Sequence, residues 1–176
     1  MVSEQIINEL KSIVGKDNVF TSKADRICYS YDATQQSFLP DVVVHPASTD
    51  EISRLMQLAN RKIIPVFPRG AGSGFTGGSL PTRGGIVLCT ERMDRILEID
   101  KDNLMVTVEP GIITGELHRA VEEQGLFYPP DPASLDSCTI GGNIAEGAGG
   151  PRAVKYGITK DYVSGLEVVL PSGDIV

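Results

Sequence analysis

The chain has 176 residues, of which 41% are apolar and 22% are charged, as in an ordinary soluble protein of one domain or a large part of one. A net charge of −7 argues against the basic surface that nucleic-acid binding requires. No run approaches the ~20 apolar residues of a membrane helix, so membrane insertion is not expected. The three cysteines show neither CxxC nor zinc-ligand spacing, which predicts no metal site and a reducing, cytoplasmic location.

The first third of the chain has the pattern of a βαβ unit. Residues 3–14 carry apolar side chains at helical spacing, and Gly15 closes this predicted helix. Residues 41–46 are predicted to form a short buried strand that ends at a proline. A helix is expected over 48–61, because it opens with the Ser-x-x-Glu spacing of a capping box. A second strand is expected over 63–67, and a helical connection between two strands predicts that they are parallel.

Shorter strand-like runs follow in the rest of the chain. Residues 85–89, 95–99 and 104–108 are apolar enough for strands, and a polar turn joins the last two as in an antiparallel hairpin. A helix begins near residue 114 and is ended by a glycine. Residues 166–176 resemble a hairpin whose second strand has only two residues. We therefore expect the chain to be a fragment of a longer protein.

Glycine is concentrated in two clusters, the first of which covers residues 70–78. Five glycines in nine residues, directly after a predicted strand, allow consecutive N–H groups to converge on an anion. Ser73 and Thr76 add hydroxyl donors, and Arg69 adds a positive charge. A GxGxxG match is present, but residues 78–85 cannot form the helix that a dinucleotide fingerprint requires. A tight connection between two sheet layers is the alternative interpretation.

The second cluster covers residues 139–150 and follows a proline-rich stretch at 128–132 that cannot form regular structure. Taken alone, this cluster is equally compatible with close packing of backbone against backbone. Its pairing with the first cluster and with the proline-rich stretch is the more specific signal.

Several motifs in order resemble a known family. They are the Pro-Arg-Gly-x-Gly-Ser-Gly-x-x-Gly-Gly loop at 68–78, Pro-Pro-Asp-Pro at 129–132, Thr-Ile-Gly-Gly-Asn-Ile-Ala-Glu at 139–146 and Lys-Tyr-Gly at 155–157. Together they resemble the FAD-binding domain of the vanillyl-alcohol oxidase/p-cresol methylhydroxylase superfamily. Within it they are closest to the group that contains D-lactate dehydrogenase and the flavin-containing subunit of glycolate oxidase. The resemblance covers about residues 20–176.

The resemblance implies an α+β fold of two subdomains with FAD extended between them. A small parallel βαβ subdomain would cover about residues 1–85. A second subdomain with a mixed or antiparallel sheet, incomplete here, would cover about residues 86–176. The residues that the resemblance assigns to the cofactor are Pro68, Arg69, Gly70, Ala71, Gly72, Ser73, Gly74, Gly77, Gly78, Pro130, Asp131, Cys138, Thr139, Gly141, Gly142, Asn143, Ala145, Glu146, Gly149, Tyr156 and Gly157.

One departure from the family pattern, and one difference from the relatives that bind flavin covalently, concern the cofactor. The family usually has an asparagine where Gly147 stands, so no side-chain contact is expected there. Relatives that tether the flavin covalently through the first loop place a histidine where Ser73 stands. The resemblance therefore implies FAD held without a covalent bond.

The function implied is oxidation of a small 2-hydroxy acid, such as glycolate, D-lactate or D-2-hydroxyglutarate, to the 2-oxo acid by hydride transfer to the flavin. Electrons would pass to an acceptor protein or subunit. No catalytic residue is expected in this segment, because substrate-binding and proton-accepting groups belong to a C-terminal cap domain. An unpaired hairpin edge would favour a homo-oligomer. The alternatives are the flavin subunit of an NAD(P)H-linked reductase and a cofactor-free, inactive fragment.

Three further residues invite functional interpretation. His45 ends a buried strand and is expected to be structural, whereas His118 lies beside an arginine on a predicted helix and is expected to be solvated. Neither has a partner at metal-ligand spacing. Cys138 adjoins the predicted flavin-facing segment, and contact through its backbone is expected rather than a reactive thiol.

Overall fold

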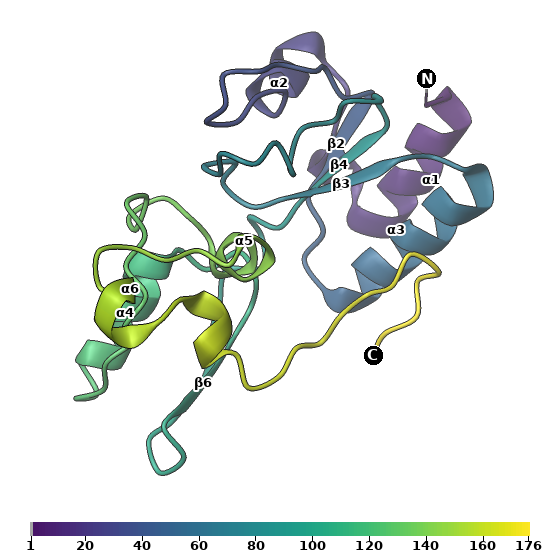
Figure 1. Ribbon diagram of the computed structural model, residues 1–176. Helices are drawn as coiled ribbons and strands as arrows, with labels where there is room; N and C mark the ends of the chain where they lie inside the picture. The colour runs from purple at the N-terminus through teal and green to yellow at the C-terminus, as the bar shows by residue number, and fades with distance from the viewer. Residues whose placement is uncertain (1) are drawn as a thin grey trace. The chain divides into compact units, whose positions relative to one another are not determined.

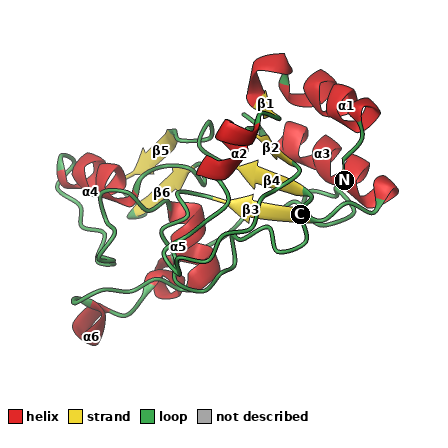
Figure 2. Ribbon diagram, turned by 90° about the horizontal axis from the view of Figure 1, so that it is seen from above, coloured by secondary structure: helices red, strands yellow, loops and turns green. Residues whose placement is uncertain are grey.

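The computed structural model describes residues 2–176, which form two compact units. The first unit contains residues 2–92 together with the C-terminal segment 166–176, and the second unit contains residues 93–165. Figures 1 and 2 show the elements of both units. Among residues 2–176, no helix combines the length and the apolar character needed to cross a bilayer.

The first unit is built on a four-stranded sheet with the order β1-β2-β4-β3. Strands β2 (Val42–Val44), β4 (Ile86–Cys89) and β3 (Val66–Arg69) are parallel, and β1 (Val19–Phe20) pairs antiparallel with β2. Val87 pairs with β2 on one side and with β3 on the other. The parallel βαβ unit expected from the sequence is therefore confirmed, with a third strand placed between its two strands.

Two helices cover one face of this sheet. α1 (Glu4–Val14) and α3 (Thr49–Lys62) lie side by side in Figure 1, and both contribute to the main core. The core includes the fully buried Leu10, Leu55 and Val42. Side chains along a strand alternate between the two faces of the sheet, so Val43, the neighbour of Val42, points to the opposite face. The opposite face carries a smaller cluster near the short helix α2 (Lys23–Cys28). The sheet is thus covered on both sides.

The structure corrects two boundaries in the first unit. The strand predicted at 63–67 begins at Val66, because Ile63 ends α3 in the left-handed conformation with φ 53°. The run 85–89 forms β4 and belongs to the parallel sheet of the first unit. The division predicted near residue 85 therefore lies after Arg92, and the C-terminal segment also belongs to the first unit.

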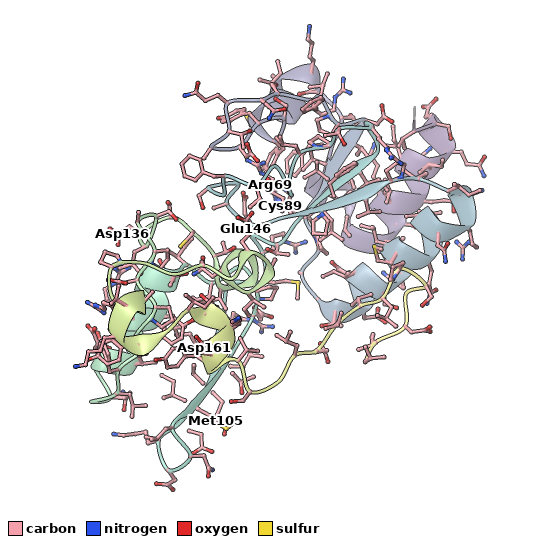
Figure 3. All side chains as sticks on the ribbon, in the orientation of Figure 1. Arg69, Cys89, Met105, Asp136, Glu146 and Asp161 are labelled. Atoms are coloured by element: carbon pink, nitrogen blue, oxygen red, sulfur yellow. The ribbon has the colours of Figure 1, made fainter. Side chains whose placement is uncertain are left out.

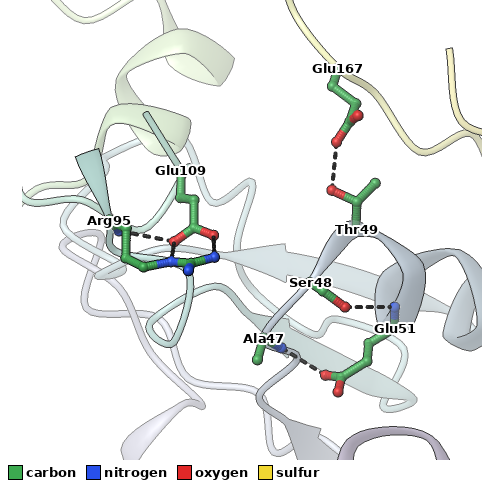
Figure 4. Close-up of polar contacts among 7 residues, drawn as sticks. All are labelled: Ala47, Ser48, Thr49, Glu51, Arg95, Glu109 and Glu167. Atoms are coloured by element: carbon green, nitrogen blue, oxygen red, sulfur yellow. Dashed lines mark hydrogen bonds and ion pairs between the residues drawn. The ribbon is translucent and has the colours of Figure 1, made fainter. Parts of the chain in front are cut away.

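The C-terminal segment 166–176 packs on α3. The backbone N–H of Val168 and the carbonyl of Val176 are 2.8 Å apart, which confirms the predicted hairpin. The hydroxyl of Ser53 donates to the carbonyl of Gly173 over 2.5 Å. Thr49 donates to a carboxylate oxygen of Glu167, as Figure 4 shows.

The second unit begins with the predicted antiparallel hairpin, β5 (Ile96–Asp100) and β6 (Met105–Val108). The carboxylate of Asp100 accepts hydrogen bonds from the N–H groups of Asp102 and Asn103 and so closes the turn. Because the turn supplies its own acceptor, the hairpin register is fixed locally.

The remaining elements of this unit are mostly helical. α4 (Thr114–Glu122) packs its inner face on a core of Ile112, Leu117, Val121 and Ile140. The other helices of this unit are α5 (Ile140–Glu146) and α6 (Ala153–Tyr156), followed by the 3₁₀ turn η2 (Thr159–Tyr162). The 3₁₀ turn η1 (Lys16–Asn18) belongs to the first unit. α5 was not predicted, because two consecutive glycines disfavour a helix. Its N-terminus is stabilised by Thr139, whose hydroxyl accepts from the N–H of Gly142.

An ion pair links the start of β5 to the end of β6. The carboxylate of Glu109 accepts from the backbone N–H of Arg95 at 2.9 Å and from two guanidinium nitrogens at 3.1 and 2.8 Å, as Figure 4 shows. The Glu109 side chain is 9% exposed, whereas that of Arg95 is 69% exposed. Hydrogen bonds from Arg95 hold the pKa of Glu109 below its ordinary value.

This lowered pKa predicts a pH-dependent stability. A carboxyl whose pKa is lowered by folding stabilises the protein above its ordinary pKa of about 4.3, and the stabilisation is lost as the pH falls through the folded-state value. Glu109→Gln should therefore lower the melting temperature at pH 7, and this loss should shrink progressively as the pH falls from about 4.3 through the lowered pKa of Glu109. The control is the exposed Glu123→Gln, which should change little at either pH. An equal loss for Glu109→Gln at pH 7 and at about pH 3 would contradict this account.

Candidate functional site

The first glycine cluster forms an irregular loop at the end of β3, in the first unit. Arg69, the last residue of the strand, is only 6% exposed. One nitrogen of its guanidinium donates to the carbonyl of Tyr31 over 2.8 Å, and its central carbon lies 5.8 Å from the centre of the Tyr29 ring. Arg69 was predicted to add a charge to an anion site. In the structure its side chain is held inside the first unit, where it supports the loop, and its charge contribution to an anion site stays a prediction.

Gly72 shows how tightly the loop depends on Arg69. Its φ is +68°, and a Cβ at this position would overlap the Arg69 guanidinium. Further along the loop, the carbonyl of Gly74 accepts from the N–H of Ala33. The loop is therefore shaped from within by Arg69 and from the side by residues 31–33. Sequence reasoning missed residues 31–33, because nothing in their composition relates them to a glycine cluster far along the chain.

The loop presents donors that the rest of the chain does not use. Among residues 2–176, the N–H groups of Ala71, Gly72 and Ser73 donate to no other group, and neither does the Ser73 hydroxyl. No helix follows the loop, as predicted. Consecutive free N–H groups in a glycine-rich turn can bind an anion. The residues present therefore fit a phosphate or pyrophosphate group.

The predicted residues of the proline-rich stretch lie in the second unit, where His118 fixes their backbone. Nε2 of His118 is 2.8 Å from the carbonyl oxygen of Pro130, and its ring meets that of Tyr128 edge to face. His118 is buried, so the expectation of a solvated side chain is wrong. It lies four residues after the buried Thr114, on the inner face of α4. That helical spacing is a sequence signal that could have placed it correctly.

Asp131 is held in place by Arg152, which lies later in the same unit. Its carboxylate accepts from the backbone N–H of Arg152 over 3.0 Å and forms an ion pair with the side chain of the same residue. The Asp131 backbone also lies against Gly150, where any Cβ would overlap the Asp131 carbonyl. Gly150 is therefore required for the close approach of two segments.

Thr114 organises two of the predicted cofactor residues, Asn143 and Cys138, from a fully buried position. Its hydroxyl accepts from the side-chain amide of Asn143 over 2.6 Å and donates to the carbonyl of Cys138 over 3.3 Å. The Cys138 thiol lies 3.4 Å from the same oxygen, and Thr139 caps α5. The side chains of Asn143, Cys138 and Thr139 are thus engaged within the unit. Contact between these residues and a cofactor remains a prediction, best supported for their backbone.

The second glycine cluster also serves close packing. A Cβ on Gly141 would stand 2.8 Å from the Cβ of Pro110, so the helix can approach this proline only with glycine at that position. The close-packing interpretation therefore applies to part of the cluster. Ala145 and Glu146 lie on the exposed side of α5.

The last predicted cofactor residues, Tyr156 and Gly157, lie at the end of α6. The Tyr156 hydroxyl accepts from the Lys155 ammonium over 3.0 Å, and its carbonyl accepts from the Tyr162 hydroxyl over 2.5 Å. The Tyr156 side chain is 38% exposed. Figure 3 shows all these side chains, with Arg69, Glu146 and Asp161 labelled. The predicted residues thus form one set in the first unit, at 68–78, and another in the second unit.

Comparisons with known proteins show which family the chain belongs to. A family model described as an FAD binding domain matches residues 40–176. Glycolate oxidase subunit GlcD of Bacillus subtilis (strain 168) is 51% identical over 177 residues, which cover 100% of this chain and 38% of that protein. D-lactate dehydrogenase of Anaerostipes hadrus is 45% identical over 137 residues, covering 78% of this chain and 29% of that protein.

A solved structure described as p-cresol methylhydroxylase with substrate bound matches with a TM-score of 0.84 and 22% identity, covering 99% of this chain and 36% of that one. This likeness shows a shared fold. It confirms, with the family model, the predicted resemblance and the predicted α+β architecture. The chain spans about a third of the length of the relatives that it matches.

The geometry at Gly72 predicts a strong effect of one methyl group on cofactor binding. Gly72→Ala forces a left-handed residue to carry a side chain that displaces the Arg69 guanidinium. Each hydrogen bond to an anionic oxygen contributes about 1.5–3 kcal/mol, so losing one or more should weaken FAD binding by about tenfold or more. Titration of the purified chain with FAD, followed by flavin fluorescence, measures the change.

A matched control is available for this substitution. Gly165 is exposed, and a Cβ at this position meets no atom within 4 Å, so Gly165→Ala should bind FAD as the unmodified chain does. The melting temperatures of both variants show whether a loss of FAD binding comes from a change in the loop or from unfolding of the whole chain. Unchanged FAD affinity in a folded Gly72→Ala variant would show that the loop does not hold the cofactor.

Proposed function

The chain belongs to the FAD binding domain family, and from that premise we propose that it is the cofactor-binding part of an oxidoreductase that oxidises a small 2-hydroxy acid to the 2-oxo acid. The observation that carries the proposal is the loop at 70–78, whose unused N–H groups and hydroxyl suit a pyrophosphate. The relatives support the choice of substrate class, because two that match well are named as a glycolate oxidase subunit and a D-lactate dehydrogenase.

The chain's own contribution would be to bind and orient the cofactor. Bound FAD would accept the hydride that leaves the carbon bearing the substrate hydroxyl. Residues 70–73 would hold the phosphates through backbone donors, and Arg69 would keep those donors in register from below. In the second unit, Thr114 and His118 would hold the backbone around Cys138 and Pro130 in a single conformation. Preorganised donors of this kind bind a ligand without paying again to order the loop.

The remaining functions of the enzyme would belong to other parts of the polypeptide. The relatives are about three times the length of this chain, which leaves room for a domain that binds the substrate carboxylate and accepts the hydroxyl proton. Electrons would then pass to an acceptor protein or subunit. The catalytic groups would therefore lie outside residues 1–176.

The mode of cofactor attachment can be tested directly. The loop holds Ser73 at the position where covalently flavinylated relatives are expected to carry a histidine, and His45 and His118 are both buried within their own units. Acid precipitation of the FAD-loaded protein should therefore release all of the flavin into the supernatant, where chromatography should identify it as FAD. Flavin that remains with the precipitated polypeptide would contradict non-covalent binding, and recovery of FMN alone would contradict the choice of cofactor.

The proposed reaction predicts a difference between this chain and a longer polypeptide. The FAD-saturated 176-residue chain should not oxidise glycolate, D-lactate or D-2-hydroxyglutarate with an artificial electron acceptor. A polypeptide extended to the length of the relatives should turn over at least one of them at an ordinary enzymatic rate of ~1–10³ per second. Reduction of the bound flavin by NAD(P)H but by none of the hydroxy acids would favour the reductase alternative. Turnover by the short chain would place the catalytic groups within residues 1–176.

A further inference from the structure

Three potential metal ligands meet in the first unit, at the carboxyl ends of two neighbouring parallel strands. His45 follows β2, Cys89 is the last residue of β4, and Glu91 lies two residues further on. One ligand atom from each residue lies within 4.8 Å of the other two. His45 is far from Cys89 and Glu91 in sequence, and only the register of β2 against β4 brings it close to them. Composition and local spacing therefore gave no sign of this cluster.

His45 has a hydrogen-bonding capacity that the described chain leaves unused. The residue is 7% exposed, and its Nε2 is buried without a partner among residues 2–176. Its Nδ1 lies 3.9 Å from a carboxylate oxygen of Glu91, which is too far for a hydrogen bond. The ring itself packs against Phe20 and Tyr29, with centroid separations of 4.7 and 5.3 Å. Buried polar atoms are rarely left unpaired in native proteins, so the imidazole can offer a ring nitrogen to a ligand.

We propose that His45, Cys89 and Glu91 bind one divalent transition-metal ion of the zinc type. A thiolate, an imidazole and a carboxylate are the ligands that Zn²⁺ takes in proteins, whereas Mg²⁺ and Ca²⁺ prefer oxygen alone. Half of the Glu91 side chain is exposed, so solvent reaches the cluster from that side. Water would complete a tetrahedral site.

The geometry requires only a small adjustment. Zinc bonds of about 2.0–2.3 Å place tetrahedral ligand atoms roughly 3.3–3.8 Å from one another. The present separations of up to 4.8 Å would contract by about 1 Å. Glu91 can supply part of this movement, because half of its side chain is exposed, and it is held by a long hydrogen bond of 3.4 Å from the Tyr29 hydroxyl and by contact with the Cys89 thiol.

The protonation states are compatible with binding. Burial lowers the pKa of His45, an effect that Glu91 opposes and Arg92 reinforces, so the imidazole is neutral and available as a ligand. Burial raises the pKa of the Cys89 thiol to about 12, so the incoming cation displaces one proton as the sulfur–metal bond forms. The thiolate and the carboxylate then balance the two positive charges. This balance matters because Arg69, which pairs with Cys89 across β3 and β4, adds a buried positive charge that acts on the Cys89 thiol; Figure 3 labels both residues.

An ion at this position would support the glycine loop. The Cys89 sulfur lies 3.8 Å from the carbonyl of Gly70, the first residue of that loop. Arg92 also donates to the carbonyl of His45 over 2.8 Å, which fixes the end of β2. The bound ion would tie the ends of β2 and β4 together directly below the loop. We therefore assign it a structural role that does not depend on flavin binding.

Cobalt titration of the chelator-treated, flavin-free chain tests the proposal. Co²⁺ replaces Zn²⁺ in tetrahedral sites, and a thiolate ligand gives a sulfur-to-cobalt absorption band in the near ultraviolet. One equivalent should develop this band together with visible ligand-field bands, and Zn²⁺ should abolish both. Zn²⁺ should also raise the melting temperature, whereas Mg²⁺ should not.

Variants identify the ligands. Cys89→Ser should lose the sulfur band, and Glu91→Gln should weaken Co²⁺ binding by about tenfold or more while the half-exposed position leaves the fold intact. Cys28→Ser is the matched control, because Cys28 is the one exposed thiol among residues 2–176 and should not contribute. Absence of the band in the unmodified chain, its loss in Cys28→Ser, or unchanged affinity in Glu91→Gln would each overturn the proposal. None of these results depends on flavin binding.

Discussion

The guanidinium of Arg69 lies buried beneath the glycine loop and determines what the loop can be. Burying a charged group is costly unless it is hydrogen-bonded, and here the Tyr31 carbonyl and the face of the Tyr29 ring provide the compensation. The space that the guanidinium fills is the space into which a side chain at position 72 would project. The guanidinium can therefore occupy this space only because residue 72 is a glycine. Without this arrangement, the free N–H groups at 71–73 would have no fixed direction.

In the second unit, a buried neutral side chain also holds neighbouring segments in place through hydrogen bonds. The Thr114 hydroxyl is fully buried and uses both its donor and its acceptor capacity within the unit. It connects the start of α4 to the segment around Cys138 and to α5. His118, one turn further along α4, does the same for the Pro130 carbonyl. One face of a single helix thus positions two of the segments that were predicted to contact the cofactor.

Local patterns predicted the elements well where their own residues decide the structure. α1, α3 and the β5–β6 hairpin follow from helical spacing, a capping serine and a polar turn, all of which are properties of adjacent residues. The position of β4 between β2 and β3 could not be predicted in this way, because strand order depends on contacts between distant segments. The helix α5 was missed for a related reason: packing against Pro110 outweighs the low helix propensity of its glycines.

The candidate site likewise contains residues that could be predicted from the sequence and others that could not. Glycine content alone located the loop at 70–78, since few other sequences allow consecutive N–H groups to converge. The resemblance supplied the residues of the second unit, and their contacts with a cofactor remain predictions. The groups that hold these segments in place, such as Arg69 on Tyr31 and His118 on Pro130, could not be read from the sequence. Each contact joins a side chain to a backbone carbonyl. Because every residue has a backbone carbonyl, the residue type of the acceptor gives no sign of the contact.

The return of the C-terminal segment to α3 has a consequence for how the chain reaches its folded state. Residues 166–176 belong to the first unit, although the whole second unit separates them from it in sequence. During synthesis the parallel sheet is complete once β4 has emerged, but Ser53 must wait for its acceptor at Gly173. The second unit is therefore an insertion, and its own folding brings the two ends of a long loop together. Because closing such a loop is costly when it is unstructured, an early-folding second unit would speed the last step of the first.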